Sequence, residues 1–583
     1  MKNFRRWSVL ALSLLVFAAA CDRCRSDQDA VPRATEARVT NLAGVLPASA
    51  KMVIMIPDLS EMRDSVDITL ERVSAFQPQI RMFEQQIARE MGIRITDEES
   101  WKNSGITPDG SLMVAVVGNR PVVATFVDDR EAFESRFIER MRQFTRTDSP
   151  VRNETIGGRS FKVSGDQAGS DIAWFYDGNM VVLAMPPFDA FGVFEEGTAT
   201  NILSNVAAAA GDGSLANDES FQTYRKGMGD RYPVSVYFSG EYLRDVGEGQ
   251  AQAAGNEIAQ FLAAFDAGDG GAGVGVRANE TRLELRSLFV GDEDLIAAAE
   301  AAFISDHDVD FSGFLTKNTL LAVRSSFDLE KAYDFYMEQL PDEDRRALRR
   351  SLSRTGQAYQ IDIEEDVIKA FSGHGVLAFY GVAGDMTRMA AMLGGGGSVG
   401  DTIRTVLANA GLVLSTHFAD QEKFDNLMAK VTEIGGDDLN QRALVYEGSE
   451  VDDVEVLEPR MLNLFPARMF VRGDTLTVAA AGIGENAAYQ YLTGDRPEGL
   501  LSDSDDFPLG KMFAEADAYN GLYLNFERLR WQIRRVPMVS GFANQLNMFH
   551  ELLATTGVDE HGIYGSLIVD FTEPLQRDEQ GAE

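Results

Sequence analysis

The chain has 583 residues, 45% of them hydrophobic, which is enough for about two to four domains. Its 90 acidic and 54 basic residues give a net charge of −36, which excludes nucleic acid as a partner and repels anionic lipid surfaces. The only two cysteines, Cys21 and Cys24, lie near the N-terminus, so the rest of the chain folds without a disulfide.

The N-terminus has the layout of an export signal. A short basic head precedes an apolar run from Ser8 to Ala20, which is too short to span a bilayer and ends in small residues. The sequence Ala18-Ala19-Ala20-Cys21 resembles the lipobox of bacterial lipoproteins. The resemblance implies that residues 1–20 are a signal peptide and that Cys21 becomes the lipidated first residue of the mature chain. The alternative is an ordinary signal peptide cut near Ala20, which would release a soluble chain.

The residues after the signal read as a tether. Residues 21–45 mix Arg, Asp, Thr and Pro with little apolar periodicity, which predicts a flexible segment. Asp22 resembles the signal that keeps enterobacterial lipoproteins in the inner membrane. The CxxC spacing of Cys21 and Cys24 lacks the βαβ context of a thioredoxin-like site, and no second pair completes a zinc site. We therefore expect the bacterial cell envelope as the location, with the protein facing the periplasm and lipid on Cys21 as its membrane partner. Whether it is held in the inner or the outer membrane stays open.

Five segments of the first half of the chain recur in the same order in the second half. The pairs are 46–62 with 315–332, 125–137 with 416–428, 176–184 with 471–479, 236–243 with 522–529, and 256–265 with 544–553. Five matches in one order predict a tandem duplication. The expected parts are repeat 1 (46–303), an acidic linker (304–312), repeat 2 (313–573) and a polar tail (574–583).

Each repeat is expected to have an α+β fold. An apolar strand leads into a helix that opens at Asp58-Leu59, and hairpins follow over 111–127, around Gly178 and over 273–290. Strands joined by tight turns are antiparallel, so we predict a mainly antiparallel sheet in each repeat, with helices covering one face.

The chain resembles a family of secreted and lipid-anchored bacterial proteins that carry a domain of unknown function. The residues behind this resemblance are Leu46-Pro47 in the first strand region, Asp58-Leu59 at the following helix, and the segment Trp101–Gly105 before the first hairpin. The resemblance implies this architecture for most of the mature chain, and it implies no particular chemistry.

The two repeats differ most at their first hairpin. Repeat 1 turns within residues 118–121, whereas repeat 2 runs from Gly381 to Ala410 before the next strand. The insert contains the apolar residues Met386, Met389, Met392 and Leu393. Methionine makes adaptable contact surfaces, so these residues could bind an apolar ligand or a partner protein. The alternative is a helix that covers a sheet edge or an apolar gap.

Sequence motifs for catalysis or metal binding are incomplete in this chain. The glycine-rich stretch 395–402 has Asp401 where a P-loop needs lysine, and no two of the five histidines have an i, i+4 spacing. His417 falls in a strand and is expected to be structural. Residues 306–310 have the start of a calcium loop without its Gly and Glu, which favours a solvated acidic joint over a loose calcium site. We therefore expect no catalytic residue, no cofactor and no metal.

Three classes of function remain open at this stage. The favoured class is a non-catalytic, membrane-anchored envelope lipoprotein that binds or scaffolds an envelope protein. The second is a carrier of a lipid or other apolar ligand, and an apolar cavity would favour it. The third is a hydrolase with a non-standard carboxylate site, which clustered acids of perturbed pKa in a cleft would favour.

Overall fold

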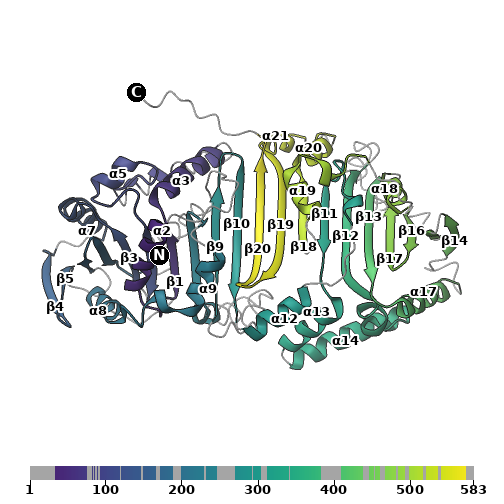
Figure 1. Cartoon of the computed structure of the whole chain (residues 1–583), viewed down its shortest axis with the longest axis horizontal. Helices are drawn as coiled ribbons and strands as arrows, with labels where there is room; N and C mark the ends of the chain where they lie inside the picture. The colour runs from purple at the N-terminus through teal and green to yellow at the C-terminus, as the bar shows by residue number, and fades with distance from the viewer. Residues whose placement is uncertain are drawn as a thin grey trace, which may run out of the picture. The chain divides into compact units, whose positions relative to one another are not determined.

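The computed structural model describes much of the chain between residues 33 and 572. The described residues are 33–74, 82, 84–85, 88–89, 92–118, 120–145, 149–165, 171–187, 198–228, 231–245, 270–291, 293–303, 311–340, 342–382, 409–436, 446–451, 454–459, 467–480, 483–492, 498–515, 520–535 and 540–572. They form two compact units (Figure 1). Unit 1 runs to residue 291 and includes 560–564, while unit 2 begins at 293 and includes 565–572.

Unit 1 is built on an antiparallel sheet. Its strands are β1 (Met52–Ile56), β2 (Leu112–Val117), β3 (Arg120–Phe126), β4 (Arg152–Ile156), β5 (Arg159–Ser164), β6 (Ile172–Asp177), β7 (Met180–Ala184), β8 (Val234–Ser239), β9 (Gly271–Ala278) and β10 (Arg282–Val290). Their order across the sheet is β4-β5-β6-β7-β3-β2-β1-β8-β9-β10. The predicted α+β class and the antiparallel pairing are confirmed.

Helices of unit 1 lie on both faces of this sheet. They are α2 (Arg33–Val45), α3 (Leu59–Ser74), α5 (Glu98–Asn103), α6 (Arg130–Ala132), the π-helix η1 (Phe133–Ile138), α7 (Glu139–Thr145), α8 (Ala199–Ala209), the 3₁₀ turn η3 (Leu215–Asn217) and α9 (Glu219–Met228). Side chains from α2, α8 and α9 share one core with Val122 and Ala124 of β3. Side chains from α3, α5 and η1 share the other core with Val123.

The prediction that helices cover only one face is therefore wrong. Successive side chains of a strand point to opposite faces, and here both sets are apolar. The β2 strand reads LMVAVV without a polar residue, whereas β3 reads RPVVATF and carries its apolar run between the buried Arg120 and Thr125. Such unbroken apolar runs are typical of strands buried on both sides.

The first helix corrects the predicted tether. Residues 33–45 form α2, and its Val39, Leu42 and Ala43 side chains are fully buried in the unit 1 core. Each fully buried aliphatic side chain stabilises the fold by about 1.5–3 kcal/mol. The second half of the predicted flexible segment is thus part of the core. The first half, residues 21–32, lies outside the described residues.

This difference can be tested by truncation. A chain that begins at residue 33 should keep the free energy of unfolding of the mature chain. A chain that begins at Pro47 loses α2 and should be destabilised by several kcal/mol, since at least three buried aliphatic side chains are removed. Urea unfolding followed by tryptophan fluorescence measures both values. Equal stability of the two truncated chains would contradict the docked helix.

The strands of unit 2 are also paired antiparallel. They are β11 (Leu321–Ser325), β12 (Phe371–Val382), β13 (Ala410–Phe418), β14 (Tyr446–Val451), β15 (Val454–Pro459), β16 (Ala467–Arg472), β17 (Thr475–Ala480), β18 (Asn520–Asn525), β19 (Phe549–Asp559) and β20 (Gly562–Phe571). Their order is β14-β15-β16-β17-β13-β12-β11-β18-β19-β20 (Figure 1). This is the order of unit 1, strand for strand.

The helices of unit 2 also pack on both faces of their sheet. They are α12 (Glu293–Phe303), η5 (Ser312–Phe314), α13 (Leu329–Gln339), α14 (Asp342–Tyr359), the π-helix η6 (Ile363–Ile368), α17 (Gln421–Gly436), α18 (Ile483–Leu492), η8 (Leu501–Asp503), α19 (Pro508–Glu515), α20 (Phe526–Arg534) and α21 (Phe542–Gln545). Side chains of α18 and α19 share a core with Val413, whereas Phe424 of α17 packs with Phe418 and Leu476 in another.

The boundary between the units lies earlier than predicted. Helix α12 groups with unit 2, although its residues were expected to close repeat 1. The physical reason is packing: Ala299 and Ala302 are buried, and the carbonyl of Ala302 accepts a hydrogen bond of 3.0 Å from the N–H of Asp328, which precedes α13. The middle of the predicted acidic linker, 304–310, lies outside the described residues.

Candidate functional site

The sequence-predicted site residues lie outside the described part of the chain. This holds for Cys21 and Asp22, and for the insert residues Met386, Met389, Met392 and Leu393. The structure does fix the ends of the insert, because β12 ends at Val382 and β13 begins at Ala410. In unit 1 the equivalent hairpin passes from Val117 to Arg120, which confirms the short turn predicted there.

A polar pocket lies in unit 1, beside the face that carries α5 and the π-helix η1. Its volume is about 890 Å³. The lining residues are Glu84, Gln85, Ala88, Arg89, Gly92, Arg94, Thr96, Asp97, Glu99, Ser100, Asn103, Ser104, Arg136 and Phe137. They come from three separate stretches of the sequence, which explains why sequence reasoning missed the pocket.

Helix α5 forms one wall of the pocket and is held in place by local hydrogen bonds. Asp97 caps it, since the Asp97 carboxylate accepts from the N–H of Glu99 at 3.1 Å. Trp101 is 7% exposed, and its indole N–H donates to the carbonyl of Ile95 at 2.9 Å. The buried indole therefore fastens the preceding loop to the helix. The Trp-centred segment of the sequence thus supports one wall of the pocket.

The carboxylates of the pocket already have donors. Glu84 accepts from the Thr96 hydroxyl at 3.1 Å, and Glu99 accepts from the Asn103 amide at 3.2 Å. Asp97 is occupied by the cap described above. Their negative charges are thus partly screened by local hydrogen bonds.

The guanidinium groups of the pocket have fewer charged partners. Arg136 donates to the carbonyl and side-chain oxygens of Asn103, both at 3.0 Å, which are uncharged acceptors. Arg89 and Arg94 are exposed, and within the described parts of unit 1 their guanidinium groups make no hydrogen bond or ion pair. The three arginines of the lining are balanced in number by Glu84, Asp97 and Glu99, so the pocket is polar and close to neutral, in a chain whose net charge is −36. Such an arrangement can bind a small polar ligand that carries a carboxylate or a phosphate group.

Beside the pocket, Glu134 of η1 collects three donors. Its carboxylate accepts from the Lys162 ammonium at 2.6 Å, the Tyr176 hydroxyl at 2.9 Å and the Trp174 indole at 3.3 Å. Burial acts to raise the pKa of Glu134, but these donors outweigh it and the pKa lies below its usual value. Glu134 is thus ionised and fully engaged, and it fixes the π-helix that also carries Arg136.

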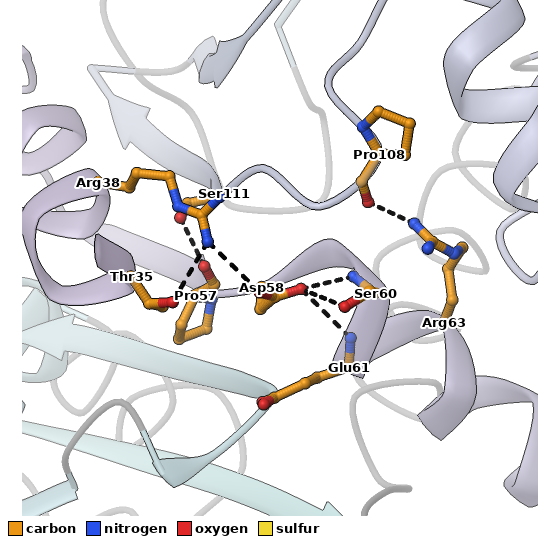
Figure 2. A network of polar contacts seen from close by, with 9 residues as sticks. All are labelled: Thr35, Arg38, Pro57, Asp58, Ser60, Glu61, Arg63, Pro108 and Ser111. Atoms are coloured by element: carbon orange, nitrogen blue, oxygen red, sulfur yellow. Dashed lines mark hydrogen bonds and ion pairs between the residues drawn. The ribbon is translucent and has the colours of Figure 1, made fainter. Parts of the chain in front are cut away.

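A second polar network joins α2 to the rest of unit 1 (Figure 2). The Asp58 carboxylate accepts from the N–H and hydroxyl of Ser60 at 2.8 and 2.6 Å, which caps α3 as the sequence predicted. Its other oxygen lies 3.5 Å from the Arg38 guanidinium of α2, and Arg38 also donates to Thr35. This network fixes the start of the core helix that forms the second half of the predicted tether.

The same turn is tied to the loop before β2. The Ser111 hydroxyl donates to the carbonyl of Pro57 at 2.5 Å, and the Arg63 guanidinium of α3 donates to the carbonyl of Pro108 (Figure 2). Ser111 is fully buried and Arg63 is 7% exposed. These are structural contacts, because each polar group is satisfied by the chain itself.

In unit 2, Glu551 is a fully buried carboxyl group. It accepts from the N–H groups of Leu509 and Gly510 at 3.1 and 3.0 Å, and from the Tyr523 hydroxyl at 2.8 Å. Burial raises the pKa of Glu551 to about 7 despite these donors. The group sits at the start of α19 inside the core, so it has no access to a substrate and acts as an internal cap.

This carboxyl should make the stability of unit 2 depend on pH. Since the pKa is about 7 in the folded state against an ordinary 4.5, the folded chain binds the proton more tightly than the unfolded chain. The free energy of unfolding should therefore fall as the pH rises through this window, by about 3 kcal/mol. Glu551→Gln should lack this component, whereas Glu515→Gln, at an exposed position of α19, should keep it. Urea unfolding at about pH 5 and pH 8 measures both. If the free energy of unfolding changed equally with pH in wild type and Glu551→Gln, the raised pKa of Glu551 would be contradicted.

The histidines of the described residues serve the fold. His417 lies in β13 as predicted, and its Nε2 is 2.8 Å from the Asp474 carboxylate. His374 is 1% exposed, stacks on Phe311 and lies 3.2 Å from the Ser326 hydroxyl. Within the described residues, no group of three acidic, cysteine or histidine side chains is arranged to hold a metal ion. No helix in the described parts is long and apolar enough to cross a bilayer.

Comparison with protein-family models, curated proteins and solved structures finds no match for this chain. The resemblance to secreted bacterial proteins with a domain of unknown function therefore stays a prediction from the sequence.

Proposed function

We propose that this protein is a non-catalytic envelope lipoprotein, anchored by lipid on Cys21, whose folded units act as a binding module. The observation that carries the proposal is the position of α2. Only 11 residues separate Cys21 from Arg33, where a helix buried in the unit 1 core begins. Even fully extended, that stretch spans only about 40 Å. A lipid on Cys21 would thus hold unit 1 close to the bilayer.

We further propose that the two units arose by duplication. Both sheets have the same strand order, and matched residues serve the same purpose in each. Asp129 and Asp420 each accept from the N–H three residues further on, at 3.0 Å. Gly178 and Gly473 have φ angles of +59° and +56° at equivalent hairpin turns. These residues lie in segments that the sequence already matched, and the shared strand order is the support that the structure adds.

The fifth sequence match fits the sheets poorly. It set Phe549 against Phe261, which lies outside the described residues. Phe549 opens β19, and β19 occupies the place that β9 has in unit 1. The segment equivalent to 549–559 is thus 271–278, so that match is out of register.

The ligand of the module is proposed to be small, polar and anionic. The pocket supports this, because within the described parts of unit 1 the guanidinium groups of Arg89, Arg94 and Arg136 contact no carboxylate. It does not favour the alternative of an apolar-ligand carrier, since its walls are mostly polar. The raised pKa of Glu551 does not favour the hydrolase alternative either, because that carboxyl lies in the core and not in a cleft.

The pocket can be tested with inorganic phosphate and citrate as probes. Either anion should raise the unfolding temperature of the mature chain above its value in NaCl of equal ionic strength. Arg89→Ala combined with Arg94→Ala should weaken the apparent affinity about tenfold or more, since charged hydrogen bonds are lost. Arg354→Ala removes an exposed guanidinium of α14 and should change nothing. If the anions raise the unfolding temperature of the double variant as much as that of wild type, the pocket is not their binding site.

Lipidation is tested on the protein purified from membranes of a bacterial host. Mass spectrometry should find an N-terminal peptide that begins at Cys21 and carries the mass of a diacylglyceryl group. Cys21→Ser should leave the membrane fraction or keep its signal peptide, while Cys24→Ser should behave as wild type. An unmodified N-terminus near residue 21 would favour the ordinary signal peptide instead.

A further inference from the structure

One stretch of unit 2 has a net charge of the opposite sign to that of the whole chain. Residues 526–535, which comprise α20 and Arg535, contain four arginines and a single acid, Glu527, for a net charge of +3. The whole chain has a net charge of −36. A basic helix on such an acidic protein needs a specific reason.

The arginines of α20 bind uncharged oxygen atoms. Arg528 donates to the carbonyl of Lys317 at 3.0 Å, Arg530 to that of Leu546 at 2.9 Å, and Arg534 to the side chain of Asn547 at 3.2 Å. In the described part of unit 2, none of these three makes an ion pair with a carboxylate. Burial and the neighbouring Arg534 lower the pKa of Arg530, although Glu527 opposes this. The positive charge here is held in place but not neutralised.

Large apolar side chains are exposed beside these charges. Trp531 is 52% exposed on α20, and Phe542 is 60% exposed on the adjacent α21 (Figure 1). Arg528, Arg534 and Arg535 lie at i−3, i+3 and i+4 from Trp531 and so surround it on the helix surface. The Arg535 guanidinium lies 4.5 Å from the centroid of the Trp531 ring.

We propose that the surface formed by α20 and α21 binds the anionic lipid surface of a membrane. Arginines around exposed Trp and Phe are the pattern of helices that lie in a bilayer interface. Each basic side chain near an anionic surface contributes about 1 kcal/mol, and the indole ring is stable at the headgroup level. An apolar partner would not use the charges, and an acidic protein would not need two exposed aromatic rings. A bilayer with anionic headgroups uses both.

This surface extends the proposed lipid anchoring with a second membrane contact. The two acyl chains of a diacylglyceryl group on Cys21 already anchor a protein stably, so this surface would add a contact and would not be the anchor itself. This surface can be tested without the lipid on Cys21. The membrane-binding surface and the lipid anchor can therefore be disproved independently of each other.

The experiment uses the mature chain, residues 21–583, with Cys21→Ser so that no lipid is attached. It is mixed with vesicles of phosphatidylcholine alone or with about one third phosphatidylglycerol, and sedimented. We expect binding to the anionic vesicles only, weakening as salt is added. Fluorescence gives a second readout, because the mature chain has three tryptophans and Trp101 and Trp174 are 7% and 1% exposed. A blue shift on binding would therefore come from Trp531.

The variant Trp531→Ala with Phe542→Ala should bind the anionic vesicles at least tenfold more weakly. Tyr336→Ala is the matched control, because this aromatic side chain is 44% exposed on α13. Both residues of the double variant are exposed, so folding should be unaffected, and circular dichroism checks this. Unchanged binding by the double variant, or no binding of wild type to anionic vesicles, would overturn the proposal. The proposal would also be overturned if an acidic peptide such as polyglutamate bound more tightly than the vesicles and the vesicles did not compete with it. That result would assign the surface to a protein partner.

Discussion

The burial of the unit 1 sheet on both faces is the constraint on which the rest of that unit depends. In its central strands, side chains of either parity are mostly buried and apolar, and helices are supplied on both sides. The central strands of unit 2 are less evenly buried, since Val323 and Leu414 are 37% and 43% exposed. In unit 1, Trp174 and Ala173 are neighbours in β6, yet they pack in different cores. The long connections between strands exist to supply those helices. The pocket arises on one of the two helical layers, where α5 and the π-helix meet.

The sequence predicted features that depend on a few neighbouring residues. Asp58 and Asp328 were placed at helix starts, and each accepts from the N–H of the third residue on. Gly178 was placed at a hairpin, because only a residue that tolerates positive φ fits there. Features that depend on distant segments were not predicted. Helix α2 was missed because only three of its 13 residues, Val39, Leu42 and Val45, are large and apolar, and it is stabilised by the sheet it covers. The pocket and the charge of α20 required knowing which segments are adjacent.

The two units reach the same fold with different interiors at equivalent positions. In unit 1, Gly271 lies opposite Ser239, and a Cβ there would come within 2.6 Å of the Tyr237 ring. In unit 2 the equivalent position, opposite Asn525, is Glu551. One unit fills this space with an aromatic ring and the other with a carboxyl group that caps α19. The first hairpin differs in the same way, because buried Arg120 pairs with Asp171 at 2.6 Å in unit 1, whereas Gly411 stands at the equivalent place. Two units with such different interiors cannot exchange segments freely, although their strand order is the same.

The docking of α2 has a mechanical consequence. With a lipid on Cys21, any pull between the membrane and the body of the protein is transmitted along the chain to Arg33. The first described element to bear that load is α2, which is held by its buried aliphatic side chains and by the Arg38–Asp58 contact. Because these contacts belong to the unit 1 core, a force on the anchor is a force on the fold itself. The first thing to yield under tension would be α2, and its release would lengthen the connection to the membrane.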